Sequence, residues 1–309
     1  MLTRRNFLLT SATGSAASLL HPLAPQAAQA ANEEKPLFSV GLIADAQYAD
    51  AEPGGIRYYR KSIDKLTAAV KDINADEVDF SIHLGDLIDR EFSSFDTILE
   101  PLRELQKPVH QILGNHDFTV SEDKKPEVAG KIGIKETYYA FSKSGFRFIF
   151  LDGTELSTFA HPEDSPIHQE ATAMMTEFQA KKRKNAQDWN SAIGPKQVTW
   201  LKKQLAQTAK ADEKAIVSCH YPILPDNVHN LWNDQEMLTL MGQHSNTVIA
   251  WFNGHNHAGN YEQHNGVHYV TVQGMVDTAD TNAYATLDVL PNALRIRGHG
   301  RVPSRLLTF

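Results

Sequence analysis

The first third of the chain alternates between short apolar runs and polar segments with helical periodicity. Strand character begins at Leu37, and apolar residues recur at three- and four-residue intervals near 57–73, which predicts an amphipathic helix. A second helix is expected near 95–105, between two further apolar runs. This order of strands and helices is typical of the β-α-β units of an α/β fold.

The later part of the chain predicts antiparallel strands. Residues 137–151 have the pattern of a β-hairpin that turns at Ser144-Gly145. The apolar and β-branched segments 266–274 and 284–300 suggest further strands near the end of the chain. We therefore expect two sheets, one of them built around the early β-α-β units.

The first 30 residues carry the pattern of a twin-arginine export signal. The motif TRRNFLL at 3–9 is followed by a weakly apolar stretch and by the small-residue exit Ala28-Gln29-Ala30, which predicts cleavage near Ala30. We expect residues 31–36 to be a short linker. An amphipathic N-terminal helix or a membrane anchor is the alternative, but one glycine and two prolines in this stretch argue against a helix that spans a bilayer.

Recognition by the twin-arginine export machinery would place the mature protein in a bacterial periplasm or outside the cell. No other run in the sequence approaches the apolar length of a membrane span, so we expect no membrane contact for the mature form. The composition, with 41% hydrophobic residues in 309, suffices for one substantial core. We assign residues 37–309 to one domain, and interpret the polar stretch at about 155–192 as an insertion over its functional site.

The charge balance speaks against a nucleic-acid partner. The chain has a net charge of -7, and loss of residues 1–30 would remove two arginines and no acid, which leaves -9. Because an acidic protein repels a polyanionic duplex, we expect no binding to nucleic acid. The basic run at 181–184 could bind phosphate or could simply face solvent. We favour the solvent-facing interpretation, because several adjacent charged residues mostly face solvent. A small phosphorylated substrate remains compatible, since two divalent cations would supply a local positive field.

The single cysteine, Cys219, excludes an intramolecular disulfide. It lies in an apolar run, directly before His220. We expect it to be a buried packing residue, because a free cysteine behaves as a small apolar side chain.

Metal-ligand side chains follow five of the apolar runs. They lie in the segments Asp45-Ala46-Gln47, Gly85-Asp86, Gly114-Asn115-His116-Asp117, Cys219-His220 and Gly254-His255-Asn256-His257. Polar residues at strand ends gather on one edge of a sheet, where open α/β sheets bind their ligands. The segments are far apart in the sequence, so the site that they predict requires the whole fold.

This donor set indicates two divalent metal ions. One ion would be held by Asp45, Gln47, Asp86 and His257, and the other by Asp86, Asn115, His220 and His255. Asp86 is the expected bridging carboxylate, because the preceding Gly85 lets the backbone turn close to the metals. Amide and carboxylate oxygens favour Mn²⁺, whereas the imidazoles leave iron and zinc open.

His116 and Asp117 are the candidate catalytic residues. An imidazole beside the metal ligand Asn115 would protonate the leaving oxygen or stabilise charge in the transition state, and Asp117 would orient it. A single histidine at a strand end is more often a satisfied structural residue than a ligand. The order of five such segments in one chain favours the metal site.

The pattern D-x-Q, GD, GNHD, H and GHNH resembles the calcineurin-like metallophosphoesterase superfamily over residues 37–309. This resemblance implies an α/β fold of two sheets, an α/β/β/α sandwich, with a dinuclear metal site at the strand ends. The common superfamily pattern begins D-x-H. In this chain Gln47 takes the place of that histidine, which exchanges an imidazole nitrogen for an amide oxygen.

The D-x-Q motif and the surrounding sequence are similar to the manganese-dependent ADP-ribose/CDP-alcohol diphosphatase branch. The similar segments are YAD at 48–50, RYYR at 57–60, the region 194–201, LWN at 231–233 and GHGRVPSR at 298–305. The resemblance implies hydrolysis of the pyrophosphate bond of nucleoside diphosphate compounds, through in-line attack of a metal-bound hydroxide on one phosphorus. The products would be a nucleoside monophosphate and a second phosphorylated compound.

Three other functions stay open from the sequence. A dinuclear site activates water without selecting the leaving group, so a general phosphodiesterase or phosphomonoesterase is the main alternative. A non-catalytic metal-binding scaffold would not need the complete set of ligands together with His116. A nuclease is disfavoured by the acidic charge balance and by the absence of an interleaved basic and aromatic strip in the sequence.

Overall fold

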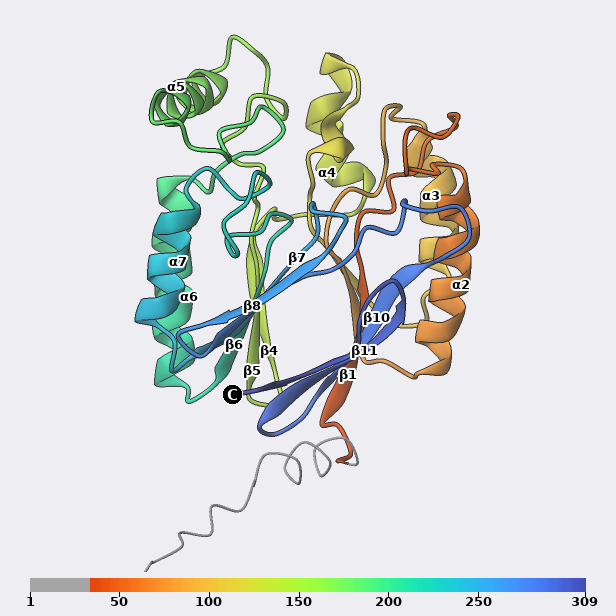
Figure 1. The fold of residues 1–309 in the computed structure, drawn as a ribbon, viewed down its shortest axis with the longest axis vertical. Helices are drawn as coiled ribbons and strands as arrows, with labels where there is room; N and C mark the ends of the chain where they lie inside the picture. The colour runs from red at the N-terminus through yellow and green to blue at the C-terminus, as the bar shows by residue number, and fades with distance from the viewer. Residues whose placement is uncertain (1–33) are drawn as a thin grey trace, which may run out of the picture. The chain divides into compact units, whose positions relative to one another are not determined.

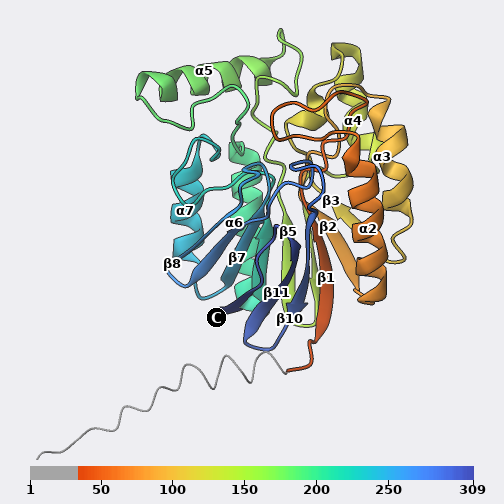
Figure 2. The same cartoon turned by 45° about the vertical axis from the view of Figure 1, so that its right-hand side comes forward.

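Two six-stranded mixed sheets pack against each other, with helices on their outer faces (Figures 1 and 2). The structure is a computed structural model and describes residues 34–309. The expected export signal at 1–30 and the first part of the expected linker at 31–36 lie outside these residues. The described part is the two-sheet α/β sandwich that the sequence predicts, and the fold-class prediction is confirmed.

The two sheets contain twelve strands of the described residues. In spatial order, the first sheet consists of β12 (Arg305–Thr308), β11 (Ala293–Gly300), β10 (Ala283–Val289), β1 (Phe38–Ile43), β2 (Phe80–His83) and β3 (Val109–Gln111). The second consists of β4 (Tyr139–Lys143), β5 (Phe146–Phe150), β6 (Lys214–Ser218), β7 (Val248–Asn253), β9 (Val267–Thr271) and β8 (Asn260–His264).

Each sheet contains a block of parallel strands. In the first sheet β1, β2 and β3 run parallel. In the second sheet β5, β6, β7 and β9 run parallel. Parallel strands end on the same edge of a sheet, and this edge is where ligands bind in α/β folds. The segments that follow β1, β2, β3, β6 and β7 are the five that carry the candidate ligands.

Helices cover the outer face of each sheet (Figure 1). The first sheet is covered by α2 (Lys61–Ala75) and α3 (Ser94–Arg103), and the second by α6 (Pro195–Lys210) and α7 (Asp234–Gln243). Four shorter or peripheral elements lie in the connections: η1 (His116–Phe118), η2 (Glu122–Glu127), α4 (Val128–Lys131) and α5 (Pro166–Ala180). The helix α5 falls within the expected insertion and lies beyond the end of the sandwich toward which β1 runs (Figure 2).

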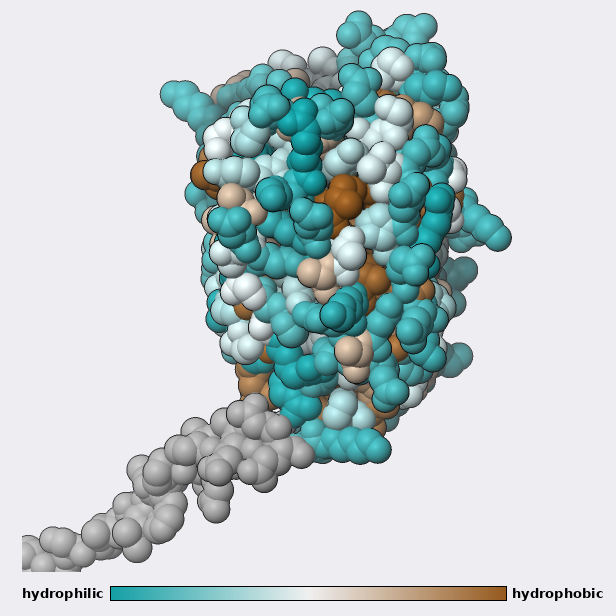
Figure 3. All heavy atoms as spheres, turned by 90° about the vertical axis from the view of Figure 1, so that its right-hand side faces the viewer, coloured by the Kyte–Doolittle hydropathy of each residue, from teal (hydrophilic) through white to brown (hydrophobic). Residues whose placement is uncertain are grey.

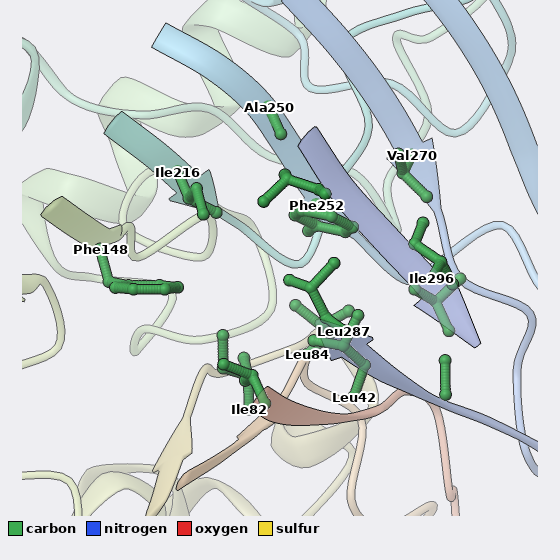
Figure 4. Close-up of a cluster of buried hydrophobic side chains, with 14 of the residues drawn as sticks. Leu42, Ile82, Leu84, Phe148, Ile216, Ala250, Phe252, Val270, Leu287 and Ile296 are labelled. Carbon is green, nitrogen blue, oxygen red and sulfur yellow. The ribbon is translucent and has the colours of Figure 1, made fainter. Parts of the chain in front are cut away.

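Side-chain alternation along β1 explains why its sequence is apolar throughout. Leu42 belongs to the layer between the sheets, with Phe252 and Leu287 (Figure 4). Its neighbour Ile43 belongs to the layer beneath α2 and α3, together with Leu66. Successive side chains of a strand face opposite sides, so a strand that is covered on both faces forms a continuous apolar run. Each such buried side chain contributes about 1.5–3 kcal/mol, and the packed layers hold the strand ends in place.

The expected hairpin is confirmed. The strands β4 and β5 pair antiparallel, with Lys143 opposite Phe146. The two residues between them, Ser144 and Gly145, have φ angles of 50° and 84°. Positive φ at both central positions is the geometry of the two-residue turn that matches the twist of a hairpin.

The first helix begins later than the periodicity predicts. It was expected from residue 57, whereas α2 begins at Lys61. Arg57 instead pairs with Asp277 through an isolated β-bridge, and the N–H of Tyr58 donates to the carbonyl of Val276 at 2.9 Å. Hydrogen bonds to a segment more than 200 positions away therefore outweigh the local helical pattern. They place Arg57 beside the strand ends.

The surface over α2 and α3 is mostly hydrophilic, with separate small apolar areas (Figure 3). Among residues 34–309, no helix combines the length and apolar character that a bilayer span demands. Cys219 is buried, as expected for a packing residue.

Candidate metal centre

The candidate ligands come together at the carboxyl ends of the parallel strands. Asp45 and Gln47 follow β1, Asp86 follows β2, Asn115 follows β3, His220 follows β6, and His255 and His257 follow β7. Two groups of three have ligand atoms within 4.8 Å of one another: Asp86, His220 and His255, and Asp45, Asp86 and His257. Asp86 belongs to both groups. This is the arrangement in which one carboxylate bridges two ions.

The two candidate amide ligands each lie beside another candidate ligand, Gln47 beside Asp86 and Asn115 beside His220. Nε2 of Gln47 donates to Asp86 Oδ2 at 2.9 Å and lies 3.0 Å from Nε2 of His257. Oε1 of Gln47 is buried without a hydrogen-bond partner in the described residues. A half-turn of the amide exchanges these two atoms and directs the unsatisfied oxygen toward Asp86 and His257. Asn115 Oδ1 lies 3.3 Å from Nε2 of His220.

Two of the candidate histidine ligands are oriented by a hydrogen bond at Nδ1, the ring nitrogen that faces away from the site. Nδ1 of His220 donates to the carbonyl of Leu84 at 2.8 Å, and Nδ1 of His257 donates to Asp277 Oδ1 at 2.9 Å. In the neutral form of each ring, which is the form that binds a metal ion, Nε2 then keeps its lone pair and faces the site, at 3.3 Å from Asp86 for His220. Such outer partners fix the tautomer of metal-binding histidines. The donor set and its orientation therefore fit divalent cations.

The backbone at four candidate ligands adopts the left-handed region. The φ angles are 51° at Asp45, 43° at Gln47, 58° at Asp86 and 67° at His255. Non-glycine residues rarely have positive φ, and such strain is concentrated at functional sites, where the surrounding structure holds it. The fold thus stores strain at the strand ends in order to direct these side chains to one point.

Two buried carboxylates set the electrostatics of the site. Burial raises the pKa of Asp45 to about 6, although His257 opposes this rise. Burial also opposes ionisation of Asp86, but His220 and His116 hold the pKa of Asp86 well below its ordinary value. The same pairing raises the pKa of His220 to about 9 against the effect of burial. Buried charges of this kind need cationic partners, which divalent metals supply.

Asp89 makes the contact to His116 that was expected of Asp117. Nδ1 of His116 lies 3.1 Å from Asp89 Oδ1, and the two side chains are 18% and 9% exposed. The carboxylate of Asp117 instead accepts backbone N–H groups, among them those of Leu87 at 2.8 Å and Gly114 at 2.9 Å. The expected orienting role of Asp117 is therefore corrected. Asp117 shapes the loop after β2, and Asp89 orients the imidazole.

Arg57 is a further residue of the site that the sequence pattern did not identify. Its Nη1 lies 3.4 Å from Nε2 of His116. The helical periodicity predicts a helix near 57–73 and gives no indication that Arg57 reaches the site. Its position follows from the β-bridge to Asp277, which itself orients His257.

The sheets and the strand-end ligands together define a metallophosphoesterase. A model of the calcineurin-like phosphoesterase family matches residues 38–259. The chain belongs to this family. It is accordingly a metal-dependent phosphohydrolase, and the predicted family resemblance is confirmed.

Individual proteins within this family are also similar to the chain. The chain is 31% identical to the manganese-dependent ADP-ribose/CDP-alcohol diphosphatase of Bos taurus, over 88% of this chain and 94% of the relative. It is likewise 31% identical to the protein of that name from Mus musculus, over 90% and 95% of the two chains. Among solved structures, a dimetal phosphatase from Danio rerio matches with a TM-score of 0.81 at 27% identity, covering 89% of this chain and 100% of that chain. The chain thus spans nearly the full length of these proteins.

Proposed function

We propose that this protein hydrolyses the pyrophosphate bond of nucleoside diphosphate compounds of the ADP-ribose or CDP-alcohol type. The observation that carries the proposal is the pair of ligand groups that share Asp86. The similarity to two diphosphatases over about nine-tenths of the chain supports the substrate class.

Two divalent ions, Mn²⁺ by preference, would be held by the seven candidate ligands in the partition that the sequence predicts. When bound, such ions lower the pKa of water and neutralise charge on phosphoryl oxygens. The oxygen-rich set around Asp45, Gln47 and Asp86 favours Mn²⁺, whereas the three imidazoles also suit iron or zinc. The name of the mammalian relatives supports manganese.

His116 and Arg57 would act on the substrate phosphates. Burial disfavours the charged imidazole, but Asp86 and Asp89 raise the pKa of His116 above its ordinary value. A protonated His116 would donate to the leaving phosphate oxygen. The guanidinium of Arg57, next to that ring, would contact the neighbouring phosphate, because guanidinium groups pair with phosphate oxygens.

Two exposed apolar residues are next in sequence to residues of the site. Ile56, which precedes Arg57, is 65% exposed, and Trp189, which precedes Asn190, is 42% exposed. Nε2 of His255 in turn contacts Asn190. Large apolar side chains beside a charged site would pack on the nucleoside or alcohol part of the substrate. Two such exposed side chains, each next in sequence to a residue of the site, would suit a substrate larger than a simple phosphate ester.

A substrate panel tests the proposal. Steady-state hydrolysis of ADP-ribose, CDP-choline, a cyclic nucleotide and a simple phosphate monoester is measured with the Mn²⁺-loaded protein and with its Asp86→Asn variant. We expect the two pyrophosphates to be preferred, and their hydrolysis to be lost in the variant. Equal or faster turnover of the monoester would establish a general phosphoesterase instead. No turnover with any divalent metal would establish a binding scaffold.

We also propose that the protein is exported through the twin-arginine machinery to the periplasm. The support is the TRRNFLL motif and the small-residue exit at Ala30, both in the sequence outside the described residues. Cell fractionation of the full chain is compared with a variant that combines Arg4→Lys and Arg5→Lys, which keeps the charge and removes the arginine pair. Retention of the variant in the cytoplasm supports export, and equal distribution of both chains contradicts it.

A further inference from the structure

Asn190 connects the expected insertion to the metal centre. Its Oδ1 lies 2.9 Å from Nε2 of His255. Its Nδ2 donates to the carbonyl of Asn185 at 2.9 Å and to the carbonyl of Val228 at 2.7 Å. The side chain is completely buried. One amide therefore contacts two loop segments and a candidate metal ligand.

The hydrogen bonds of Asn190 determine the tautomer of His255. Backbone carbonyls only accept hydrogen bonds, so the two bonds to Asn185 and Val228 require the nitrogen of the amide on that side. The oxygen must then face His255, and Nε2 of His255 must carry the proton. Nδ1 keeps the lone pair, which is the form that binds a metal ion.

The two segments that Asn190 joins, 185–191 and 228–232, are bonded to each other at further points. The backbone N–H of Trp232 donates to the carbonyl of Ser191 at 2.8 Å. The side chain of Asn185, also completely buried, donates to the backbone of the second segment at 2.5 Å. These bonds hold the two segments together as a pair. Asn190 belongs to this pair and also forms the hydrogen bond to His255.

We propose that Asn190 is a positioning residue of the metal site, which couples metal binding by His255 to the packing of segment 185–191 against segment 228–232. The inference goes beyond the reaction and rests on the proposed function only in taking His255 as a metal ligand. Coupling between two equilibria is reciprocal. Packed segments favour the metal-binding form of His255, and bound metal stabilises the packed segments by the same free energy.

Metal titrations separate this role from a merely structural one. Binding of Mn²⁺ to the metal-free full chain is measured by calorimetry for Asn190→Ala, Asn190→Asp and the matched control Asn185→Ala. The control removes a buried amide from the same segments without touching His255. We expect Asn190→Ala to weaken the binding of one ion by about 10–100-fold, the usual effect of losing an outer partner of a metal-binding histidine. Asn190→Asp keeps the acceptor for His255 but sets an oxygen against the carbonyls of Asn185 and Val228, so we expect it to recover only part of this affinity. Asn185→Ala loosens the paired segments but leaves the bond to His255, and we expect a clearly smaller loss than in Asn190→Ala.

An equal loss in Asn185→Ala, or parent affinity in Asn190→Ala, would overturn the proposal. Hydrogen exchange supplies a second measurement that needs no substrate. We expect Mn²⁺ to slow exchange of the N–H groups of Asn190 and Trp232 in the parent, compared with the chelator-treated protein. The slowing disappears in Asn190→Ala. Slowing of equal size in that variant contradicts the coupling, and neither result depends on which phosphate compound the enzyme hydrolyses.

Discussion

Nδ1 of His116 lies 3.1 Å from Oδ1 of Asp89, and both residues come from loops that follow parallel strands of the first sheet. A carboxylate in this position holds the imidazole in one orientation, with Nε2 directed toward Arg57. With His116 in its proposed catalytic role, Asp89 would act on the reaction indirectly, by orienting that ring.

The first prediction concerns this pair. If Asp89 acts through His116, Asp89→Asn lowers kcat by about tenfold, His116→Gln lowers it by about a hundredfold or more, and the double variant is no slower than His116→Gln alone. Initial rates with ADP-ribose at saturating Mn²⁺ measure all four proteins. Additive losses in the double variant would show that Asp89 acts independently of His116.

The second prediction concerns Asp117, whose carboxylate accepts the N–H groups of Asp86, Leu87 and Gly114 at 3.1, 2.8 and 2.9 Å. Asp117→Asn replaces one acceptor oxygen by a donor that faces these N–H groups. We expect the free energy of unfolding to fall by about 3 kcal/mol, since at least one buried N–H group is left without an acceptor. Urea unfolding in the presence of chelator measures it. Asp89→Asn is the comparison, and a larger loss there than in Asp117→Asn contradicts the assignment.

The meeting of the candidate ligand segments was predictable because the rule that places them is local. Each follows an apolar run, and the ends of parallel strands must meet at one edge of a sheet. Asp86 and His220 are 134 positions apart in the sequence, yet both obey this rule. The fold class followed from the same runs, together with the hairpin turn at Ser144-Gly145.

The residues that support the ligands were not predictable in this way. Asp277 lies 20 positions from His257, and Asn190 lies 65 positions from His255 within a polar stretch. Their contacts depend on the paths of irregular loops, which no hydrophobic period encodes. Asp89 is only three positions after Asp86, but the sequence around a single acidic residue in a loop does not indicate that it contacts His116. The pattern at Arg57 favoured a helix because bonds to a distant segment are invisible in a local window.

The third prediction concerns Gly114, where the loop after β3 passes close to Asp86 in the loop after β2. A Cβ at Gly114 would lie 2.6 Å from the backbone nitrogen of Asp86 and would also overlap its carboxylate. Gly114→Ala must therefore displace the carboxylate that both ligand groups share. We expect Mn²⁺ affinity to fall about tenfold or more, as measured by calorimetry. The matched control is Gly130→Ala, because a Cβ at Gly130 meets nothing within 4 Å. Parent affinity in Gly114→Ala would contradict the bridging position of Asp86.

The fourth prediction concerns stability in acid, away from the metal site. Asp288 on β10 is buried and accepts hydrogen bonds from Ser39 at 2.7 Å and Arg295 at 2.9 Å. Burial opposes its ionisation, but these bonds and Arg297 hold the pKa of Asp288 below its ordinary value. A carboxyl whose pKa is lower in the folded state stabilises the fold above its unfolded pKa of about 3.9, and this contribution is lost as pH falls through the folded value.

Asp288→Asn removes that contribution. We expect the variant to be less stable than the parent by about 2 kcal/mol at pH 7. The difference should stay constant down to about pH 5 and shrink below about pH 4, because the parent alone loses the ionised group there. Urea unfolding of the chelator-treated proteins across this range measures the difference, with Asp280→Asn, an exposed position, as the control. A difference that persists unchanged at the lowest pH would mean that packing, and not the charge of Asp288, stabilises this part of the sheet.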